Sequence, residues 1–351
     1  MKHVWHYVYR ISIQHMSKIG RAFLRFLRSL SWRGRSVIVL TLVGAAMFWL
    51  WYSAYASFAY YFLITRANNI EGPERHLALS SYNVVVERKP IAGLSDNVSG
   101  LSFSQATGTL FTVINRKPEA AELSVEGDLL RRIPIIGGRD PEGITHVEGD
   151  MFIIADEGDD SLHLVRIGPG TDEIILGEGY RLRLDIGAFK NMSLEGLSWD
   201  SRHKRLFAVQ EMLPLRVLAI GGLIKTTGGE LVSSDIQEWH LRDLSSLFTL
   251  DLSSVALHEQ TESLLLLSHL SAMLVEYSLD GRALGMMSLL KGHHGLTETV
   301  GQAEGVAVGQ DGDIFIVSEP NLFYRFKRCE RSKVTWGSWW QTCAAATAKP
   351  I

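Results

Sequence analysis

Acidic side chains recur at two positions of a repeated unit in this chain. One position directly precedes a glycine or serine at the head of each repeat, and the other lies near the end of the strand that follows. In an up-and-down hairpin the start of one strand lies beside the end of the next, so we expect both sets around one opening. The head positions hold Ser99, Glu142, Glu195, Ser253 and Glu304, and the strand-end positions hold Asn115, Asp156, Glu211, His269 and Glu319.

Like charges that face each other across two strands destabilise a sheet, and this register predicts three such pairs. The pairs are Glu142 with Asp156, Glu195 with Glu211, and Glu304 with Glu319. A calcium ion would offset them, because Ca²⁺ takes six to eight oxygen ligands, whereas Mg²⁺ needs a tighter octahedron and Zn²⁺ prefers His or Cys. The expected calcium ligands are Asn115, Glu142, Asp156, Glu195, Glu211, Glu304 and Glu319. Alternatively, these acids accept hydrogen bonds from backbone amides of neighbouring strands and turns.

The elements that position these side chains are short strands joined by tight turns. Such a meander is too small to be stable alone, and five copies follow one another at the spacing of propeller blades. The sequence therefore predicts an all-β fold, a five-bladed β-propeller; the alternative is a β-sandwich with coincidental hairpins. The copies span residues 97–125, 140–167, 191–220, 251–279 and 302–328.

A strand also precedes the first copy, at residues 81–91. We expect it to pair with the blade that starts near Gln302, because an N-terminal strand that completes the last blade closes the ring and buries the sheet edges.

An uncharged segment of 28 residues, 37–64, lies near the N-terminus, and it is long enough to cross a bilayer with some tilt. Residues 1–70 hold nine Lys or Arg and no Asp or Glu. By the positive-inside rule this predicts one transmembrane helix with a cytoplasmic N-terminus, in the inner (plasma) membrane of a bacterium, with the propeller outside. The expected parts are a basic tail at 1–36, the anchor at 37–64, a linker at 65–80, the propeller at 81–328 and a C-terminal segment at 329–351, which could complete the last blade.

Two points of processing stay open. Ala54-Tyr55-Ala56 has the small-x-small form of a signal-peptidase site, so cleavage after Ala56 is the alternative to an uncleaved anchor. The two cysteines, Cys329 and Cys343, could form a disulfide outside the inner membrane or stay as thiols.

Short motifs give the chain a family resemblance. The heads SGLSF, PEGIT, LEGLSW and AEGVAV and the second strands TLFTVIN, MFIIADE, RLFAVQE and DIFIVSE, together with the N-terminal membrane segment, resemble the SdiA-regulated (YjiK-like) family over about residues 80–330. The resemblance implies a five-bladed propeller, distantly similar to NHL-repeat proteins, with a calcium site and no established enzymatic activity. The fourth repeat departs from the pattern with Ser253-Ser254 and His269, so we expect the ion off the axis, away from that blade.

Together these features predict a membrane-anchored, periplasm-facing, calcium-binding propeller that acts as an interaction module. Its partner would be a protein or a small molecule, and no nucleic acid is expected. The alternative is a calcium-dependent hydrolase of the phosphoesterase or lactonase type in the acidic mouth, with His269 as the general base.

Overall fold

The computed structural model describes residues 31–52, 54–71, 76–95, 97–183, 194–211, 215–225, 230–242 and 244–329. It divides into two compact units, Met1–Ser53 and Ala54–Ile351. The described part of the first unit is essentially one helix. The described part of the second unit holds the propeller, one further long helix, the short helix α4 (Ser245–Phe248) and two short 3₁₀ turns, η1 (Leu79–Ser81) and η2 (Glu157–Asp159). The C-terminal segment beyond Cys329 lies outside the described residues.

Helix α2 (Trp32–Tyr52) carries no charge after Arg35, and its stretch Trp32–Leu50 is long and apolar enough to cross a membrane. Among the described residues it is the one helix with these properties. The predicted anchor segment 37–64 is shared between α2 and α3 (Ala54–Glu71), and α3 belongs to the propeller unit.

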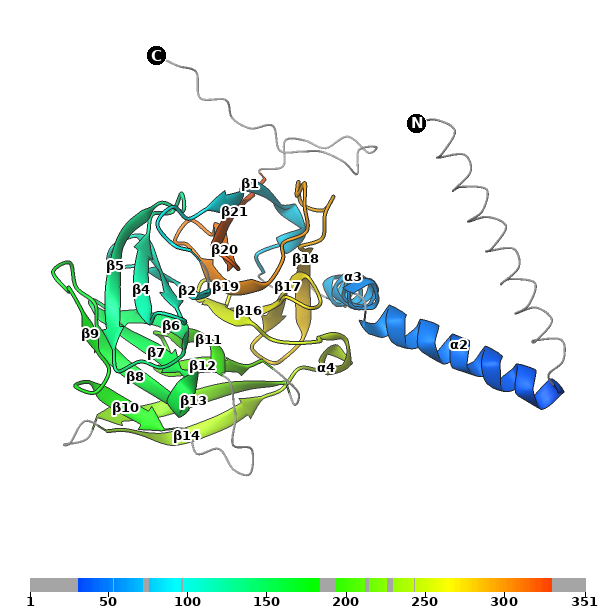
Figure 1. Ribbon diagram of the computed structural model, residues 1–351, viewed down its shortest axis with the longest axis horizontal. Helices are drawn as coiled ribbons and strands as arrows, with labels where there is room; N and C mark the ends of the chain where they lie inside the picture. Colours follow the sequence, from blue (N-terminus) through cyan, green and yellow to red (C-terminus); the bar gives the residue numbers. More distant parts are fainter. Residues whose placement is uncertain are drawn as a thin grey trace, which may run out of the picture. The chain divides into compact units, whose positions relative to one another are not determined.

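Five antiparallel sheets stand around a common centre, which confirms the predicted five-bladed propeller (Figure 1). Blade 1 holds β2 (Val98–Ser104), β3 (Thr109–Ile114), β4 (Glu119–Leu123), β5 (Leu129–Ile136) and the short parallel strand β9 (Ile174–Ile175). Blade 2 holds β6 (Pro141–Glu148), β7 (Met151–Asp156), β8 (Ser161–Arg166) and β10 (Tyr180–Arg183). Blade 3 holds β11 (Leu194–Asp200), β12 (Arg205–Gln210), β13 (Arg216–Lys225) and β14 (Leu231–Trp239).

Blade 4 holds β15 (Ser254–His258), β16 (Ser263–Ser268), β17 (Met273–Ser278) and β18 (Ala283–Ser288), and blade 5 holds β19 (Ala303–Val308), β20 (Ile314–Ser318), β21 (Leu322–Arg328) and β1 (Tyr82–Pro90). The first strand of the propeller thus completes the last blade. Tyr82 pairs with Arg328 and Pro90 with Leu322, which confirms the predicted closure of the ring.

The hydrophobic core is divided into five clusters, and each cluster fills the space between two neighbouring blades. Successive side chains of a strand point to opposite faces, so Leu110 packs against blade 5 while Phe111 packs against blade 2. Strands buried on both faces carry nearly continuous apolar runs, as in β16, where every residue is buried. This packing fixes where each innermost strand begins, and therefore where the head residues lie.

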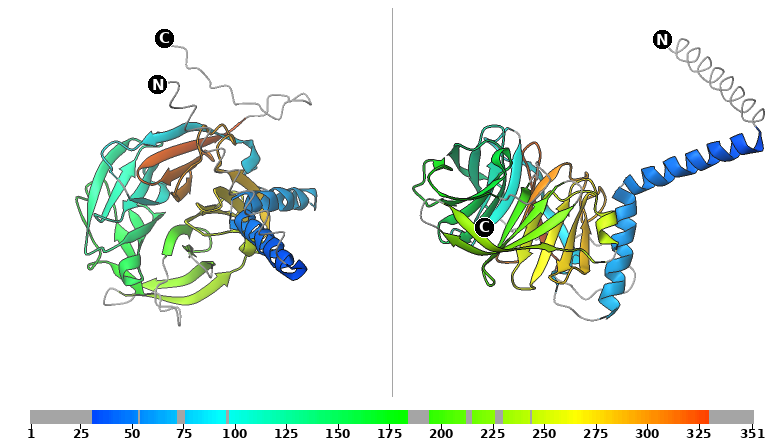
Figure 2. Two further views of the ribbon diagram at one scale, coloured as in Figure 1. Left: turned by 45° about the vertical axis from the view of Figure 1, so that its right-hand side comes forward. Right: turned by 90° about the horizontal axis from the view of Figure 1, so that it is seen from below.

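Helix α3 packs against the outer side of blade 4 (Figure 2). Tyr61 is fully buried there, and its hydroxyl lies 2.6 Å from both the Tyr277 hydroxyl and Thr249 Oγ1. Asn68 Nδ2 donates to the Ala283 carbonyl at 2.6 Å. These contacts join α3 to the propeller.

Candidate functional site

The glutamate at three of the repeat heads is the extra residue of a β-bulge. In blade 2, Pro141 pairs with Asp156 and Gly143 pairs with Ala155, so Glu142 has no residue opposite it. The bulge bends the strand and redirects the side chain. The register of β11 shifts in the same way at Glu195.

Glu304 of β19 occupies the third bulge. The expectation that each head glutamate directly faces an acid of the next strand is therefore wrong. Proline, not Glu142, lies opposite Asp156, and Glu319 falls beyond the end of the β19–β20 pairing. The bulges keep the backbone pairing on both sides and turn the carboxylates out of the sheet.

The glycine after each of these glutamates permits a close approach between blades. A Cβ atom at Gly196 would lie 2.6 Å from the Cα of Ser254, and one at Gly305 would lie 2.7 Å from the carbonyl carbon of Gly100. These neighbours are backbone atoms of the next innermost strand, which cannot move aside. The Glu-Gly step thus combines two functions: the glycine lets the narrow ring close, and the bulge presents the glutamate at its mouth.

In blade 2, the residue that corresponds to the strand-end positions of the other blades is not the one we expected. The residue that follows the second strand donates its backbone N–H to a carbonyl just before the head, as in Asn115 to Asn97 (3.3 Å) and Glu319 to Gln302 (3.0 Å). In blade 2 the same bond joins Glu157 to the carbonyl of Asp140 at 2.9 Å. Glu157, and not Asp156, is therefore the blade 2 counterpart of the other strand-end residues. A slip of one residue sends a side chain to the other face of the strand.

An acidic cluster forms at the head of blade 2 from Asp140, Glu142 and Glu157. One carboxylate oxygen of each lies within 4.8 Å of the others, and Glu142 is buried. Asn115 of blade 1 donates from Nδ2 to Glu142 Oε1 at 2.7 Å. Its Oδ1 is buried and has no hydrogen-bond partner among the described residues. We refer to Asn115, Asp140, Glu142 and Glu157 as the blade 2 cluster.

Burial raises the pKa of Glu142 to about 7, even though the hydrogen bond from Asn115 acts in the opposite direction. The charges of Asp140 and Glu157 add to the effect of burial. Burial also raises the pKa of Asp140, with a further contribution from the charge of Asp156. Glu142 is therefore partly protonated near neutral pH, and a bound cation would displace that proton.

Asp156 has a local structural role. Its carboxylate accepts hydrogen bonds from the backbone N–H groups of Arg139 (2.8 Å), Asp140 (2.9 Å) and Gly158 (3.0 Å), and it thereby caps η2. This is the amide-capping alternative, and for this acid the structure shows it. A capped turn holds Glu157 in the position from which it joins the blade 2 cluster.

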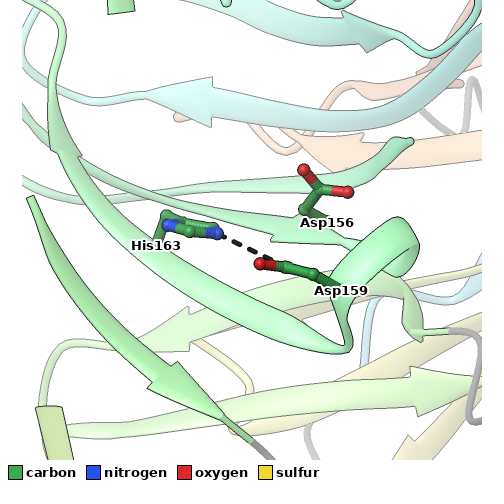
Figure 3. Close-up of side chains that lie close together, drawn as sticks. All are labelled: Asp156, Asp159 and His163. Carbon is green, nitrogen blue, oxygen red and sulfur yellow. Dashed lines mark ion pairs between the residues drawn. The ribbon is translucent and has the colours of Figure 1, made fainter. Parts of the chain in front are cut away.

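Asp156 also lies close to Asp159 and His163 (Figure 3). The imidazole of His163 lies 3.7 Å from Asp159, and Ser161 Oγ lies 2.7 Å from His163 Nε2 and is hydrogen-bonded to Asp159. Arg181 contacts Asp159 at 3.2 Å. Protein groups thus already occupy these polar atoms, and burial lowers the pKa of His163 so that the neutral imidazole is favoured.

A second polar cluster joins blades 3, 4 and 5 around His269. Nδ1 of His269 lies 2.8 Å from Asp251 Oδ2, off the direction of a regular hydrogen bond, and 3.9 Å from Glu304 Oε1. Asp251 is fully buried and accepts bonds from Ser268 Oγ and from the N–H groups of His269 and Leu270. We refer to Glu211, Asp251, His269, Glu304 and Glu319 as the His269 cluster.

The contact with Asp251 raises the pKa of His269, against the effect of burial. Burial raises the pKa of Glu304 to about 7, which the positive charge of His269 opposes and the charges of Glu319 and Glu211 reinforce. The pKa of Glu211 is likewise raised by burial, with His269 opposing. The protein thus supplies a cation of its own in this cluster.

Five of the seven predicted ligands belong to these two clusters. Asn115 and Glu142 belong to the blade 2 cluster, Glu211, Glu304 and Glu319 to the His269 cluster, and Glu195 is buried at the head of blade 3. Asp140, Glu157 and Asp251 were missed. The position two residues before each head could have found two of them, because it is polar in every repeat: Asn97, Asp140, Ser193, Asp251 and Gln302.

A family model for SdiA-regulated proteins matches residues 74–327, from before β1 into β21. The chain belongs to the SdiA-regulated family. Solved structures similar to this SdiA-regulated chain include a chain of a nidogen/laminin complex (TM-score 0.42, 12% identity, 64% of this chain and 73% of the other). Others are streptogramin B lyase (0.42, 10%, 71% and 99%) and a luciferin-regenerating enzyme (0.44, 12%, 70% and 95%).

The two clusters of the SdiA-regulated chain differ in one chemical respect. In blade 4 the residue after the second strand is His269, whose imidazole can carry a positive charge, whereas the corresponding residue of blade 2 is Glu157. Among the described residues, the groups that act most strongly on Glu142 are amide, hydroxyl and carboxyl groups, and none of them is a cation. The blade 2 cluster is thus the one suited to an external cation.

Proposed function

We propose that this SdiA-regulated protein is a membrane-anchored, calcium-binding β-propeller that presents its acidic mouth to a protein or small-molecule partner. The observation that carries the proposal is the blade 2 cluster, in which the carboxyl groups of Asp140 and Glu157 lie close to the buried carboxyl group of Glu142, whose pKa is raised. Placing several acids at this distance is unfavourable without a compensating charge.

The donor set favours Ca²⁺. Carboxylates of Asp140, Glu142 and Glu157 offer up to six oxygen atoms, and the Oδ1 of Asn115, which lacks a partner among the described residues, is a further neutral oxygen. No histidine or cysteine belongs to this cluster, which makes Zn²⁺ the poorer fit. When bound, the ion would neutralise the acids and fix the edges of blades 1 and 2, which frame the mouth.

Calorimetric titration of the detergent-solubilised full chain with Ca²⁺ tests the site. We expect saturable binding that Glu142→Gln and Glu157→Gln each weaken at least tenfold. Glu148→Gln is the matched control, because Glu148 lies on the same sheet with a largely exposed side chain. Unchanged affinity in both cluster variants would contradict the site, and saturable binding lost only in Glu304→Gln would move it to the His269 cluster.

The anchoring part of the proposal rests on α2 and on the basic residues before it. The positive-inside rule orients the propeller to the periplasmic side of a bacterial inner membrane. We expect the protein to remain with membranes after extraction with alkaline carbonate and to be released by detergent. Recovery of the full-length chain in the carbonate supernatant would contradict the anchor.

A second candidate function, a calcium-dependent hydrolase, draws on the Asp251–His269 pair. A buried aspartate that lies 2.8 Å from a histidine nitrogen is a pairing that can support general base catalysis. Generic phosphoester and lactone substrates, assayed with and without EGTA, test this function. Turnover that disappears in both EGTA and His269→Ala would establish hydrolysis, and its absence leaves the interaction module.

A further inference from the structure

Helix α3 exposes an apolar stripe on the side that faces away from blade 4. Tyr55, Phe62 and Leu63 are 64%, 41% and 67% exposed, and Ala59 between them is exposed as well. Their spacing of four, three and one residues places them on one face of a helix. The opposite face, with Ser57, Tyr61 and Thr65, is buried against the propeller. A surface helix of a water-soluble domain normally places polar residues on such an outer face.

The neighbouring short helix α4 (Ser245–Phe248) extends this apolar surface. Phe248 stacks on Tyr60 at a ring distance of 4.4 Å, which joins the two helices. Beside this contact, Leu244 and Leu247 are 59% and 50% exposed. Five large apolar side chains from two segments of the chain thus lie uncovered on one side of the propeller, and exposed patches of this kind mark interaction surfaces.

The short link between α2 and α3 indicates which surroundings cover this apolar surface. Only one residue separates the end of α2 at Tyr52 from the start of α3 at Ala54. Consecutive Cα atoms are about 3.8 Å apart, so α3 must begin within about 8 Å of the end of the proposed membrane span. Tyrosine, phenylalanine and arginine side chains favour that zone of a bilayer. Arg66, whose guanidinium lies 5.1 Å from the centre of the Phe62 ring, is placed to reach the phosphate groups.

We propose that the exposed face of α3, together with Leu244 and Leu247, lies in the interface of the bilayer that α2 crosses. The propeller then rests on the membrane through blade 4 and does not hang from a flexible tether. This inference depends on the proposed anchor.

Spin labels on the full chain in lipid nanodiscs test the inference. Single cysteines are introduced as Leu63→Cys on α3, Leu247→Cys on α4, Leu40→Cys on α2 and Leu130→Cys on blade 1; all four leucines are at least half exposed. The unmodified chain, labelled in parallel, gives the background of its native cysteines. We expect labels at positions 40, 63 and 247 to collide more with oxygen than with a water-soluble nickel chelate, and the label at position 130 to show the reverse.

The possible outcomes separate the anchor from the docked face. If the label at position 40 is in lipid and the labels at 63 and 247 are in water, the docked face is wrong and the anchor stands. If the label at position 40 is also in water, the anchor fails as well. Labels at 63 and 247 that are shielded from both reagents and broadened by a second spin would show that another copy of the chain covers the face, which also overturns the proposal.

Discussion

Two carboxyl groups at the propeller mouth, Glu142 and Glu304, have pKa values of about 7 because they are buried, although each belongs to a different cluster. An acid with a raised pKa in the folded state binds protons that the unfolded chain has already released. Its effect on stability therefore has a definite sign and a definite pH range.

For Glu142, the range extends from the ordinary pKa of 4.5 to about 7. Within it the folded state holds more protons, so the free energy of unfolding falls as the pH rises. Glu142→Gln removes this loss. Without calcium, we expect the free energy of unfolding of the variant, compared with that of the wild type, to be about 2 kcal/mol higher at about pH 8 than at about pH 5. Urea denaturation in EGTA at the two pH values measures the difference, and parallel changes in variant and wild type would contradict it.

The contribution of His269 to stability depends on pH in the opposite direction. Its pKa is raised by Asp251, so it contributes stability below the ordinary pKa of 6.5 and loses this contribution as the pH rises through the higher folded value. We expect His269→Gln to cost about 1 kcal/mol more at about pH 6 than at about pH 9. His258→Gln is the control. Burial lowers the pKa of His258, so we expect its removal to raise the free energy of unfolding more at the lower pH than at the higher one. The same trend in both variants would refute this account.

Most residues of the site could be found from the sequence, but their grouping could not. The repeat heads point to Glu142 and Glu304, because the Glu-Gly step recurs in the sequence. The sequence contains no comparable signal for a β-bulge, because the register shift depends on how the strand packs against the next blade. The same holds for blade 2, where a one-residue error in phase selected Asp156 in place of Glu157.

At the scale of the elements, the glycines of the innermost strands determine whether five blades can close. Gly196→Ala would place a Cβ atom 2.6 Å from backbone atoms of Ser254 and Val255. We expect it to lower the free energy of unfolding by about 1–3 kcal/mol, the usual cost of overpacking. Gly170→Ala is the control, because a Cβ atom there meets no atom within 4 Å. Thermal unfolding of both variants measures the effect, and equal midpoints would disprove the close-approach explanation.

The number of blades and the closing strand were predicted correctly because hydrophobic alternation and turn residues are local signals. The division of residues 37–64 into two helices was not predicted. The segment is apolar on both sides of Ser53, and tertiary contacts with blade 4, which bury Ser57, Tyr61 and Thr65, distinguish α3 from α2.

At the scale of the whole molecule, calcium should stabilise the propeller as one cooperative unit. A ligand that binds the folded state alone adds about 2.7 kcal/mol at a concentration one hundred times its dissociation constant. Protons compete for the same carboxylates, so we expect the rise in melting temperature to be larger at about pH 8 than at about pH 6. Calorimetric scans with calcium and with EGTA measure it, and a rise that is independent of pH would exclude Glu142 as a ligand.

The pairing of β1 with β21 also constrains how the protein is made. The ribosome produces β1 before the other strands of the ring, whereas β21, its strand partner among the described residues, is made after the strands of the other four blades. Until β21 is made, β1 must wait with open backbone groups, and such edges readily pair with other chains. Contacts between distant parts of a chain also form slowly. Newly made chains are therefore most prone to aggregation before β21 is available. During that time they depend on another molecule to cover the unpaired edge of β1.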